Sequence, residues 1–213
     1  HRSLVEYYAR QRLLTGGSDE WRAFSASLRT ALPVTFRAVR LPGREAESNR
    51  NWAEGMRLVA ALEAEGEPAG TALPWCRGYS LGLSRMQLRD AASRPGTAAA
   101  AVQRWLVASN NRLGLIVRQE VVSMLPAVVL GAKPGERVLD LCGAPGSKSS
   151  QLLEHIVGAT ASRSGFLVTN DVSPERAYII ASKLRALGSR GGCFAVCTGG
   201  GQTQPGGGDA GVV

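Results

Sequence analysis

The most restrictive feature of the sequence is an alternation of short apolar runs and helical segments between residues 113 and 197. Three runs have the length and composition of strands: Arg137–Cys142, Gly165–Asn170 and Cys193–Cys197. Helical patterns precede the first run and separate the three. Because a strand, a helix and a further strand in succession form a parallel pair with a right-handed crossover, the sequence predicts an α/β fold with a parallel sheet. We expect the first run to be buried on both faces.

The loop after the first run predicts a ligand site. Residues Asp140 to Lys148 read D-x-C-x-A-P-G-S-K. They lack the third glycine of the dinucleotide fingerprint, and Ser147 separates Gly146 from Lys148 where a P-loop has Gly-Lys as neighbours. Open α/β sheets bind ligands at the carboxyl ends of their strands, and the positive end of the following helix favours a carboxylate. Asp171 follows the second run, where an acidic side chain can bind ribose hydroxyls. A carboxylate and a ribose both occur in S-adenosylmethionine, which we predict as the cofactor.

The first 112 residues follow a different pattern. Helical spacing covers residues 2–14, 18–32, 51–65 and 97–109, and the alternating run Val34–Val39 predicts a strand. Residues 66–84 are expected to be an irregular connection. The predicted organisation is a basic, mainly helical region at 1–112, a parallel-sheet domain at 113–197, and a disordered Gly-rich tail at 198–213.

Positive charge is concentrated early in the chain. Residues 1–135 contain 18 Lys and Arg against 11 Asp and Glu, whereas residues 136–213 contain 7 against 6. Arg supplies 22 of the 25 basic residues, and its guanidinium suits phosphate contacts and stacking on bases. This charge favours a nucleic-acid partner for residues 1–112, although GC-rich coding would also raise the Arg content. The four Trp are expected to be core residues rather than platforms for bases.

Four motifs in order resemble the Sun family (RsmB type) of RNA cytosine-5 methyltransferases, and most closely its eukaryotic tRNA members. They are "LPVTFR" at 32–37, "RQEVVSMLP" at 118–126, the loop at 140–148, and "NDVSPERAYII" at 170–180. The resemblance covers roughly residues 2–40 and 98–197. It implies a Rossmann-like S-adenosylmethionine-dependent methyltransferase sheet, RNA and especially tRNA as the partner, and a nuclear location.

The resemblance also implies roles for single residues. Asp171 would hold the cofactor ribose, unless it is only a loop or cap residue. Arg37 would lie near the RNA, or else be a surface charge. Gln119 and Glu120 would border the pocket or belong to a solvated helix face. The methionine part of the cofactor would be cradled by the loop residues Cys142, Gly143, Ala144, Pro145, Gly146, Ser147 and Lys148. The side chain of Cys142 is expected to be buried.

The catalytic cysteines of the family have no counterpart in this sequence. In the family, one cysteine thiolate attacks C6 of cytosine and a second helps to release the product, and they lie in D-x-P-C-S-G and T-C-S segments. Neither segment occurs here, and the four cysteines lie elsewhere, at Cys76, Cys142, Cys193 and Cys197. We expect the first part of a methyltransferase, with no catalytic residue in this chain and no methyl transfer by it alone. The alternatives are a non-catalytic RNA-binding module and a disfavoured small-molecule methyltransferase.

The remaining expectations concern the surroundings of the chain. No two cysteines have Cys-x-x-Cys spacing and only two His are present, so neither a metal site nor a disulfide framework is predicted. We expect a reducing, intracellular compartment. No run of 18 apolar residues predicts a membrane span, and the opening residues lack the apolar core of a signal peptide. In the family, a further strand pairs beside the first strand of the parallel sheet. We therefore expect the first strand, at 137–142, to have an open, aggregation-prone edge here.

Overall fold

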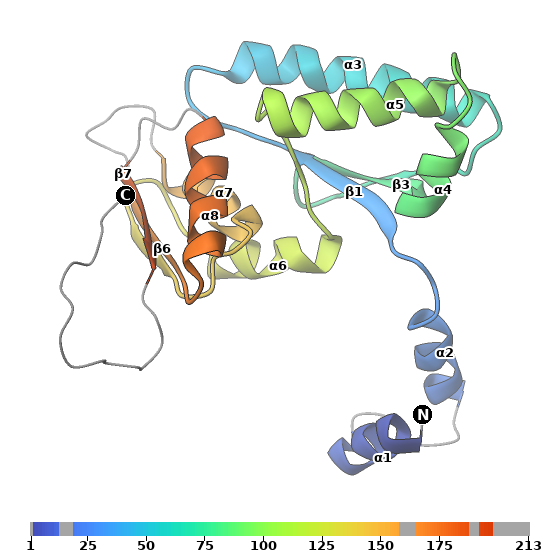
Figure 1. Cartoon of the computed structure of the whole chain (residues 1–213), viewed down its shortest axis with the longest axis horizontal. Coiled ribbons are helices and arrows are strands. Elements are labelled where there is room, and N and C mark those ends of the chain that lie inside the picture. Colours follow the sequence, from blue (N-terminus) through green and yellow to red (C-terminus); the bar gives the residue numbers. More distant parts are fainter. Residues whose placement is uncertain (1, 13–18, 158–164, 188–191, 198–213) are drawn as a thin grey trace. The chain divides into compact units, whose positions relative to one another are not determined.

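The computed structural model describes residues 2–12, 19–157, 165–187 and 192–197 (Figure 1). The chain divides into two units, His1–Leu32 and Pro33–Val213. The first unit contains α1 (Arg2–Gln11) and α2 (Asp19–Ser27), and its aromatic rings pack together, with Tyr8 edge-on to Phe24 at 5.0 Å. The helix predicted at 18–32 ends early, at Ser27, where the hydroxyl of Ser27 donates to the carbonyl of Phe24.

The second unit begins with an antiparallel four-stranded sheet of order β2-β3-β1-β4. Its strands are β1 (Pro33–Ala38), β2 (Thr71–Ala72), β3 (Gly78–Ser84) and β4 (Ile116–Arg118). The predicted irregular connection at 66–84 is therefore wrong in part, since it contains β2 and β3. β3 is difficult to predict from residue propensities because it contains glycines, which are rare in strands. The packing nevertheless requires glycine, since a Cβ on Gly82 would lie 2.2 Å from the carbonyl oxygen of Pro68.

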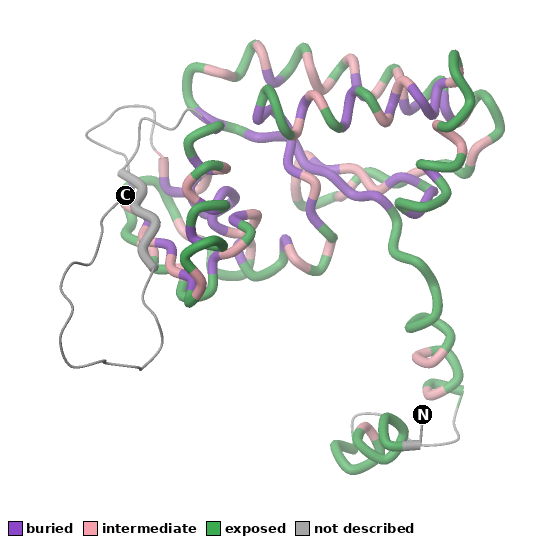
Figure 2. Tube along the Cα trace, in the orientation of Figure 1, coloured by how far each residue is buried: buried purple, intermediate pink, exposed green. Residues whose placement is uncertain are grey.

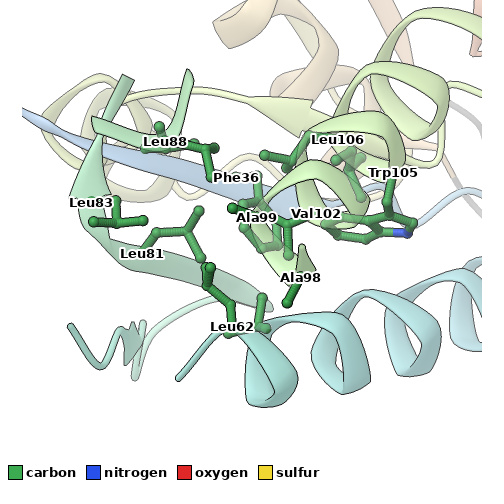
Figure 3. Packing of buried hydrophobic residues seen from close by; sticks show 13 residues of the cluster. Phe36, Leu62, Leu81, Leu83, Leu88, Ala98, Ala99, Val102, Trp105 and Leu106 are labelled. Atoms are coloured by element: carbon green, nitrogen blue, oxygen red, sulfur yellow. The ribbon is translucent and has the colours of Figure 1, made fainter. Parts of the chain in front are cut away.

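Two long helices cover one face of this sheet and lie side by side (Figure 1). They are α3 (Glu45–Ala64) and α5 (Ala98–Val107), with the short α4 (Arg85–Ala91) between them in sequence. A Cβ on Gly55 would lie 2.1 Å from the ring of Trp105, so glycine permits this close approach. Trp105 and Phe36 pack edge-on at 5.2 Å in an apolar core formed by both helices and the sheet (Figure 3). Figure 2 marks the buried residues along β1 and on the facing sides of these helices.

A π-helical turn, η1 (Ala108–Arg112), connects α5 to β4, and α6 (Val121–Leu130) follows. The helical pattern expected before the first parallel strand begins only at Val121, because residues 116–118 pair with β1. β4 thus lies beyond the predicted boundary at residue 112 but completes the sheet that begins before it. Pro126 is accommodated inside α6.

The second sheet is parallel, as the alternation of strands and helices predicts, with order β5-β6-β7. Its elements are β5 (Arg137–Asp140), α7 (Ser147–Ile156), β6 (Phe166–Asp171), α8 (Pro174–Ala186) and β7 (Gly192–Cys197). Ser173 caps α8, accepting from the amide of Arg176 over 3.3 Å. A second apolar core lies between this sheet, α7 and α8, and includes Leu153, Leu167 and Ile180.

β5 is less buried than predicted. Leu139 is 60% exposed, and β5 pairs with β6 alone among the described strands, so the expected burial on both faces is wrong. The predicted disordered tail at 198–213 lies outside the described residues. None of the helices in the described part of the chain is long and apolar enough to cross a membrane.

Candidate functional site

The loop between β5 and α7 is held against the carboxyl end of β6 by backbone amides. The amide of Gly143 donates to the carbonyl of Asn170 over 2.7 Å, and the amide of Ala144 donates to Oδ2 of Asp171 over 3.3 Å. The first glycine is required by this packing, because a Cβ on Gly143 would lie 1.9 Å from Oγ1 of Thr169. The loop predicted from the sequence and the acidic residue predicted 25 positions after Gly146 are therefore in direct contact.

The same loop presents the start of α7. Gly146 is the N-cap and has a φ of 89°, in the left-handed region that favours glycine. The peptide bond between Ala144 and Pro145 is cis. No side chain caps the first turn of α7, so its amides and the positive end of the helix can receive an anion. Lys148, in this first turn, is half-buried.

A second lysine reaches the loop, and sequence analysis missed it. Nζ of Lys183, on α8, donates to Oγ of Ser147 over 2.8 Å. Burial, with a smaller effect from the charge of Arg37, lowers the pKa of Lys183 to about 8. Its position could have indicated this placement, because Lys183 follows the buried Ile180 by three residues and so adjoins the inward stripe of its helix.

Asp171 is buried, with 3% of its surface exposed. Its Oδ1 accepts from the amide of Ser173 over 3.2 Å, and Nη2 of Arg176 lies 3.4 Å from its Oδ2. Together with the bond from Ala144, these contacts make Asp171 a brace between the loop and the start of α8. A ribose could bind this carboxylate by replacing Arg176, whose side chain is 55% exposed.

The exposed surface beside this brace is mainly apolar. Leu141, Cys142 and Val172 follow the ends of β5 and β6 and are all exposed. The expectation that the Cys142 side chain is buried is wrong, because β5 ends at Asp140 and Cys142 belongs to the loop. Asp140 itself is tied to α7, accepting from Oγ of Ser149 over 2.7 Å.

Arg37 lies inside the molecule rather than on its surface. It is 3% exposed, and its Nη1 is 2.5 Å from Oε1 of Glu154 on α7. Its other nitrogens donate to Oε1 of Gln119 and Oγ of Ser150, each over 3.1 Å. The alternative of a surface charge is therefore wrong, and a direct contact between Arg37 and RNA stays a prediction. Burial raises the pKa of Glu154, while the charge and hydrogen bond of Arg37 oppose the rise.

The other two predicted pocket residues, Gln119 and Glu120, have different environments in the structure. Gln119 is 6% exposed and joins the buried network, donating to the carbonyl of Ser123 over 2.8 Å. Its assignment to a solvated helix face is wrong, because it bridges β1, α6 and α7. Glu120 is exposed, at the N-cap position of α6.

The described cysteines do not combine with a base or a metal. Burial raises the pKa of Cys76, which disfavours the thiolate form. Cys142 is exposed in the loop. The side chains of Cys193 and Cys197, on β7, lie outside the described residues. Within the described part of the chain, no group of His, Cys, Asp and Glu side chains could hold a metal ion.

Sequence comparison relates the chain to RNA-modifying enzymes. It is 36% identical over 175 residues to the multisite-specific tRNA:(cytosine-C(5))-methyltransferase of Saccharomyces cerevisiae, covering 80% of this chain and 25% of that protein. It is 34% identical to the tRNA (cytosine(34)-C(5))-methyltransferase of Drosophila melanogaster, covering 87% of this chain and 26% of that protein. The chain thus spans about a quarter of the length of these relatives. No protein-family model matches it.

Structural comparison gives the same class of fold. The structure of NSun6 from Pyrococcus horikoshii, solved with SFG, matches with a TM-score of 0.55 at 16% identity, over 93% of this chain and 65% of that one. The structure of PH0851 matches with a TM-score of 0.51 at 20% identity, over 87% of this chain and 33% of that one. At such identities the likeness concerns the fold, which is α/β.

Proposed function

Because this chain belongs to the Sun family of RNA cytosine-C5 methyltransferases, we propose that it forms the part of such an enzyme that binds S-adenosylmethionine and contacts RNA, most specifically tRNA. The observation that carries the proposal is the contact between the loop at 142–148 and Asp171 at the carboxyl ends of β5 and β6. Ligands of parallel α/β sheets bind at this edge. The proposed domain is a Rossmann-like sheet, of which β5, β6 and β7 are the first three strands.

The residues at this edge fit S-adenosylmethionine in their chemistry. The uncapped start of α7 supplies backbone donors for the cofactor carboxylate, and Lys148 adds a positive charge. Asp171 offers a carboxylate to the ribose diol. Gly143 and Gly146 allow the backbone to approach closely, and the exposed apolar residues beside them suit the remainder of the cofactor.

S-adenosylmethionine, when bound, supplies an electrophilic methyl group. The proposed task of this chain is to bind and orient that cofactor and to hold RNA nearby. Neither cysteine whose side chain the structure describes suits a nucleophile for cytosine, because Cys76 has a raised pKa and Cys142 would lie in the cofactor loop. We therefore propose that the 213-residue chain alone transfers no methyl group to tRNA. Incorporation of a tritiated methyl group into tRNA by the purified chain would contradict this.

Isothermal titration of the full chain with S-adenosylmethionine tests cofactor binding. The proposal expects saturable binding, and expects Asp171→Asn to weaken it by roughly tenfold or more, since a hydrogen bond to a charged group contributes about 1.5–3 kcal/mol. Asp90→Asn is the matched control, because Asp90 is an exposed residue of α4. Circular dichroism melting of each variant separates loss of binding from loss of folding. No binding by the folded parent chain would refute the cofactor assignment.

A non-catalytic RNA-binding module is the second candidate, favoured by the basic first part and by the buried, already bonded carboxylate of Asp171. It predicts salt-sensitive tRNA binding without cofactor binding. The same titration, combined with a tRNA binding assay, distinguishes the two candidates.

A further inference from the structure

A cavity of about 420 Å³ lies beside the C-terminal half of α7. It is lined by the end of β1 and the residues that follow it, by the segment before β3, and by the second half of α7. This volume is within the range of small-ligand sites, roughly 300–1,000 Å³. None of its lining residues belongs to the loop at 142–148 and Asp171 does not line it, so the cavity is distinct from the proposed cofactor site, although Arg37 reaches the carbonyl of Ser147 over 3.5 Å.

Positive charge in this cavity is only partly neutralised. It contains the guanidinium groups of Arg37, Arg40 and Arg77 and the carboxylates of Glu45 and Glu154. Glu154 pairs with Arg37 and also accepts from the backbone amide of Arg40 over 2.9 Å, and Glu45 accepts from the amide of Gly43 over 2.9 Å. Within the described part of the chain, the guanidinium of Arg40 forms no ion pair within 4.0 Å, although its charge opposes the rise that burial causes in the pKa of Glu154. Apart from the pair of Arg37 with Glu154, the cavity therefore contains two cations, Arg40 and Arg77, and one carboxylate, that of Glu45.

Arg77 is held in place before any ligand arrives. It donates to Oδ1 of Asn49, and its guanidinium carbon lies 5.3 Å from the ring centroid of Trp52. Burial lowers the pKa of Arg77, and the charge of Arg40 lowers it further, so the two cations repel one another. A phosphate between them would relieve this repulsion and accept from both groups.

Aromatic surface adjoins these cations. Trp75 is 36% exposed, whereas Trp52 and Trp105 pack into the core of the first sheet. The expectation that the Trp residues belong to the core therefore fails for Trp75. His155 lines the same cavity and is half-buried; burial, with a smaller effect from Arg37, lowers its pKa, so it is mainly neutral at pH 7. A neutral imidazole can both donate and accept a hydrogen bond.

We propose that this cavity binds one unpaired nucleotide of the RNA substrate, with its phosphate between Arg40 and Arg77 and its base stacked on Trp75. Unpaired bases are commonly recognised by stacking on aromatic side chains beside Arg. Because the cavity shares no lining residue with the proposed cofactor site, we take this nucleotide to be a neighbour of the modified one rather than the modified one itself. The inference rests on the proposed function only in taking RNA as the partner.

Fluorescence anisotropy with a labelled tRNA transcript and the full chain tests the site. Trp75→Ala is expected to weaken binding by about tenfold, given about 1–3 kcal/mol for each stacked base, and Trp75→Phe is expected to restore most of it. Arg40→Ala is expected to reduce the slope of log affinity against log salt by about 0.7–0.9, the contribution of one phosphate contact. Met86→Ala and Arg89→Ala are matched controls, because both residues are exposed on α4.

Crosslinking locates the contact independently of any variant. RNA that contains 4-thiouridine is expected to crosslink to the tryptic peptide spanning residues 58–77, which includes Trp75. Parent-like binding by both Trp75→Ala and Arg40→Ala, or equal losses in the α4 controls, would overturn the proposal. Absence of tRNA binding by the parent chain at low salt would also overturn it. Cofactor titration gives a separate result, so failure here and failure of the proposed cofactor site are distinguishable.

Discussion

The carboxylate of Asp171 would be contacted both by Arg176 and by the ribose of the proposed cofactor. Its carboxylate already contacts Arg176, and a ribose diol would have to replace that contact. Arg176→Gln is therefore expected to strengthen S-adenosylmethionine binding by roughly two- to fivefold, because partly exposed ion pairs contribute about 0.2–1 kcal/mol. Isothermal titration measures the change. Weaker binding would mean instead that Arg176 itself contacts the cofactor.

Burial of Lys183 beside the cofactor loop makes the free energy of unfolding depend on pH. Its pKa falls to about 8 in the fold, against about 10.4 in an unfolded chain, so folding favours the neutral amine. Below pH 8 the buried ammonium destabilises the fold, and this cost disappears as the pH rises from about 8 to about 10.4. Lys183→Met is expected to raise the free energy of unfolding at pH 7 by about 1–3 kcal/mol, and by much less at pH 10.

Urea denaturation at the two pH values measures this difference, and Lys133→Met, at an exposed site, controls for the loss of one positive charge. A gain from Lys183→Met that is the same at both pH values would mean that apolar packing, not deprotonation, is its source. A loss at pH 7 would mean that the bond to Ser147 outweighs the cost of burial.

At the scale of elements, the ion pair between Arg37 and Glu154 joins β1 to α7. Both side chains are almost fully buried, at 4% and 7% exposed. Removing one partner leaves a buried, unpaired charge, so Glu154→Leu is expected to lower the free energy of unfolding by about 3–5 kcal/mol. The double change Arg37→Met with Glu154→Leu is expected to recover most of this loss. A double-mutant cycle by urea denaturation measures the coupling, and additive losses would contradict the expectation.

The same pair marks the limit of what the sequence could predict. Alternation along β1 correctly predicts a strand with Val34 and Phe36 on one apolar face, but it leaves Arg37 on the other face without an assigned environment. That face is covered by α7, whose Glu154 lies 117 positions away in the sequence, so no local pattern could pair the two. By contrast, Gly143 and Gly146 are predictable, because backbone geometry at those positions depends on the residue itself.

The parallel sheet could be predicted for a related reason: strand, loop and helix follow one another within about 20 residues, and each has its own local signal. The antiparallel sheet could not. β3 contains Gly78 and Gly82, β2 has two residues, and β4 has three, so pairing with β1 rather than propensity creates them. The roles of the cofactor loop and Asp171 in binding stay predictions.

At the scale of the whole molecule, the division at Leu32 differs both from the domain boundary predicted at residue 112 and from the change in charge at residue 135. Charge and helix content change where the parallel sheet begins, yet β4 pairs back to β1 and Arg37 bonds to α7. These long-range contacts place both sheets in one structural unit. The two apolar cores divide between Ile116 and Val117, but Val39 and Leu41 from the early part of the chain pack in the second core, so the cores are interlinked.

The exposed edge of β5 determines how the whole chain should behave at high concentration. Leu139 and Leu141 are 60% and 66% exposed, and β5 has unpaired backbone groups on the side away from β6 among the described strands. Such an edge can pair with the same strand of a second copy.

We expect concentration-dependent self-association, which Leu139→Lys should suppress by placing a charge on the edge. Sedimentation velocity over a range of concentrations measures it. Met86→Lys, an equivalent change on α4, is the control. A parent chain that stays monomeric at every concentration, or association reduced equally by both variants, would show that β5 does not mediate contact between copies.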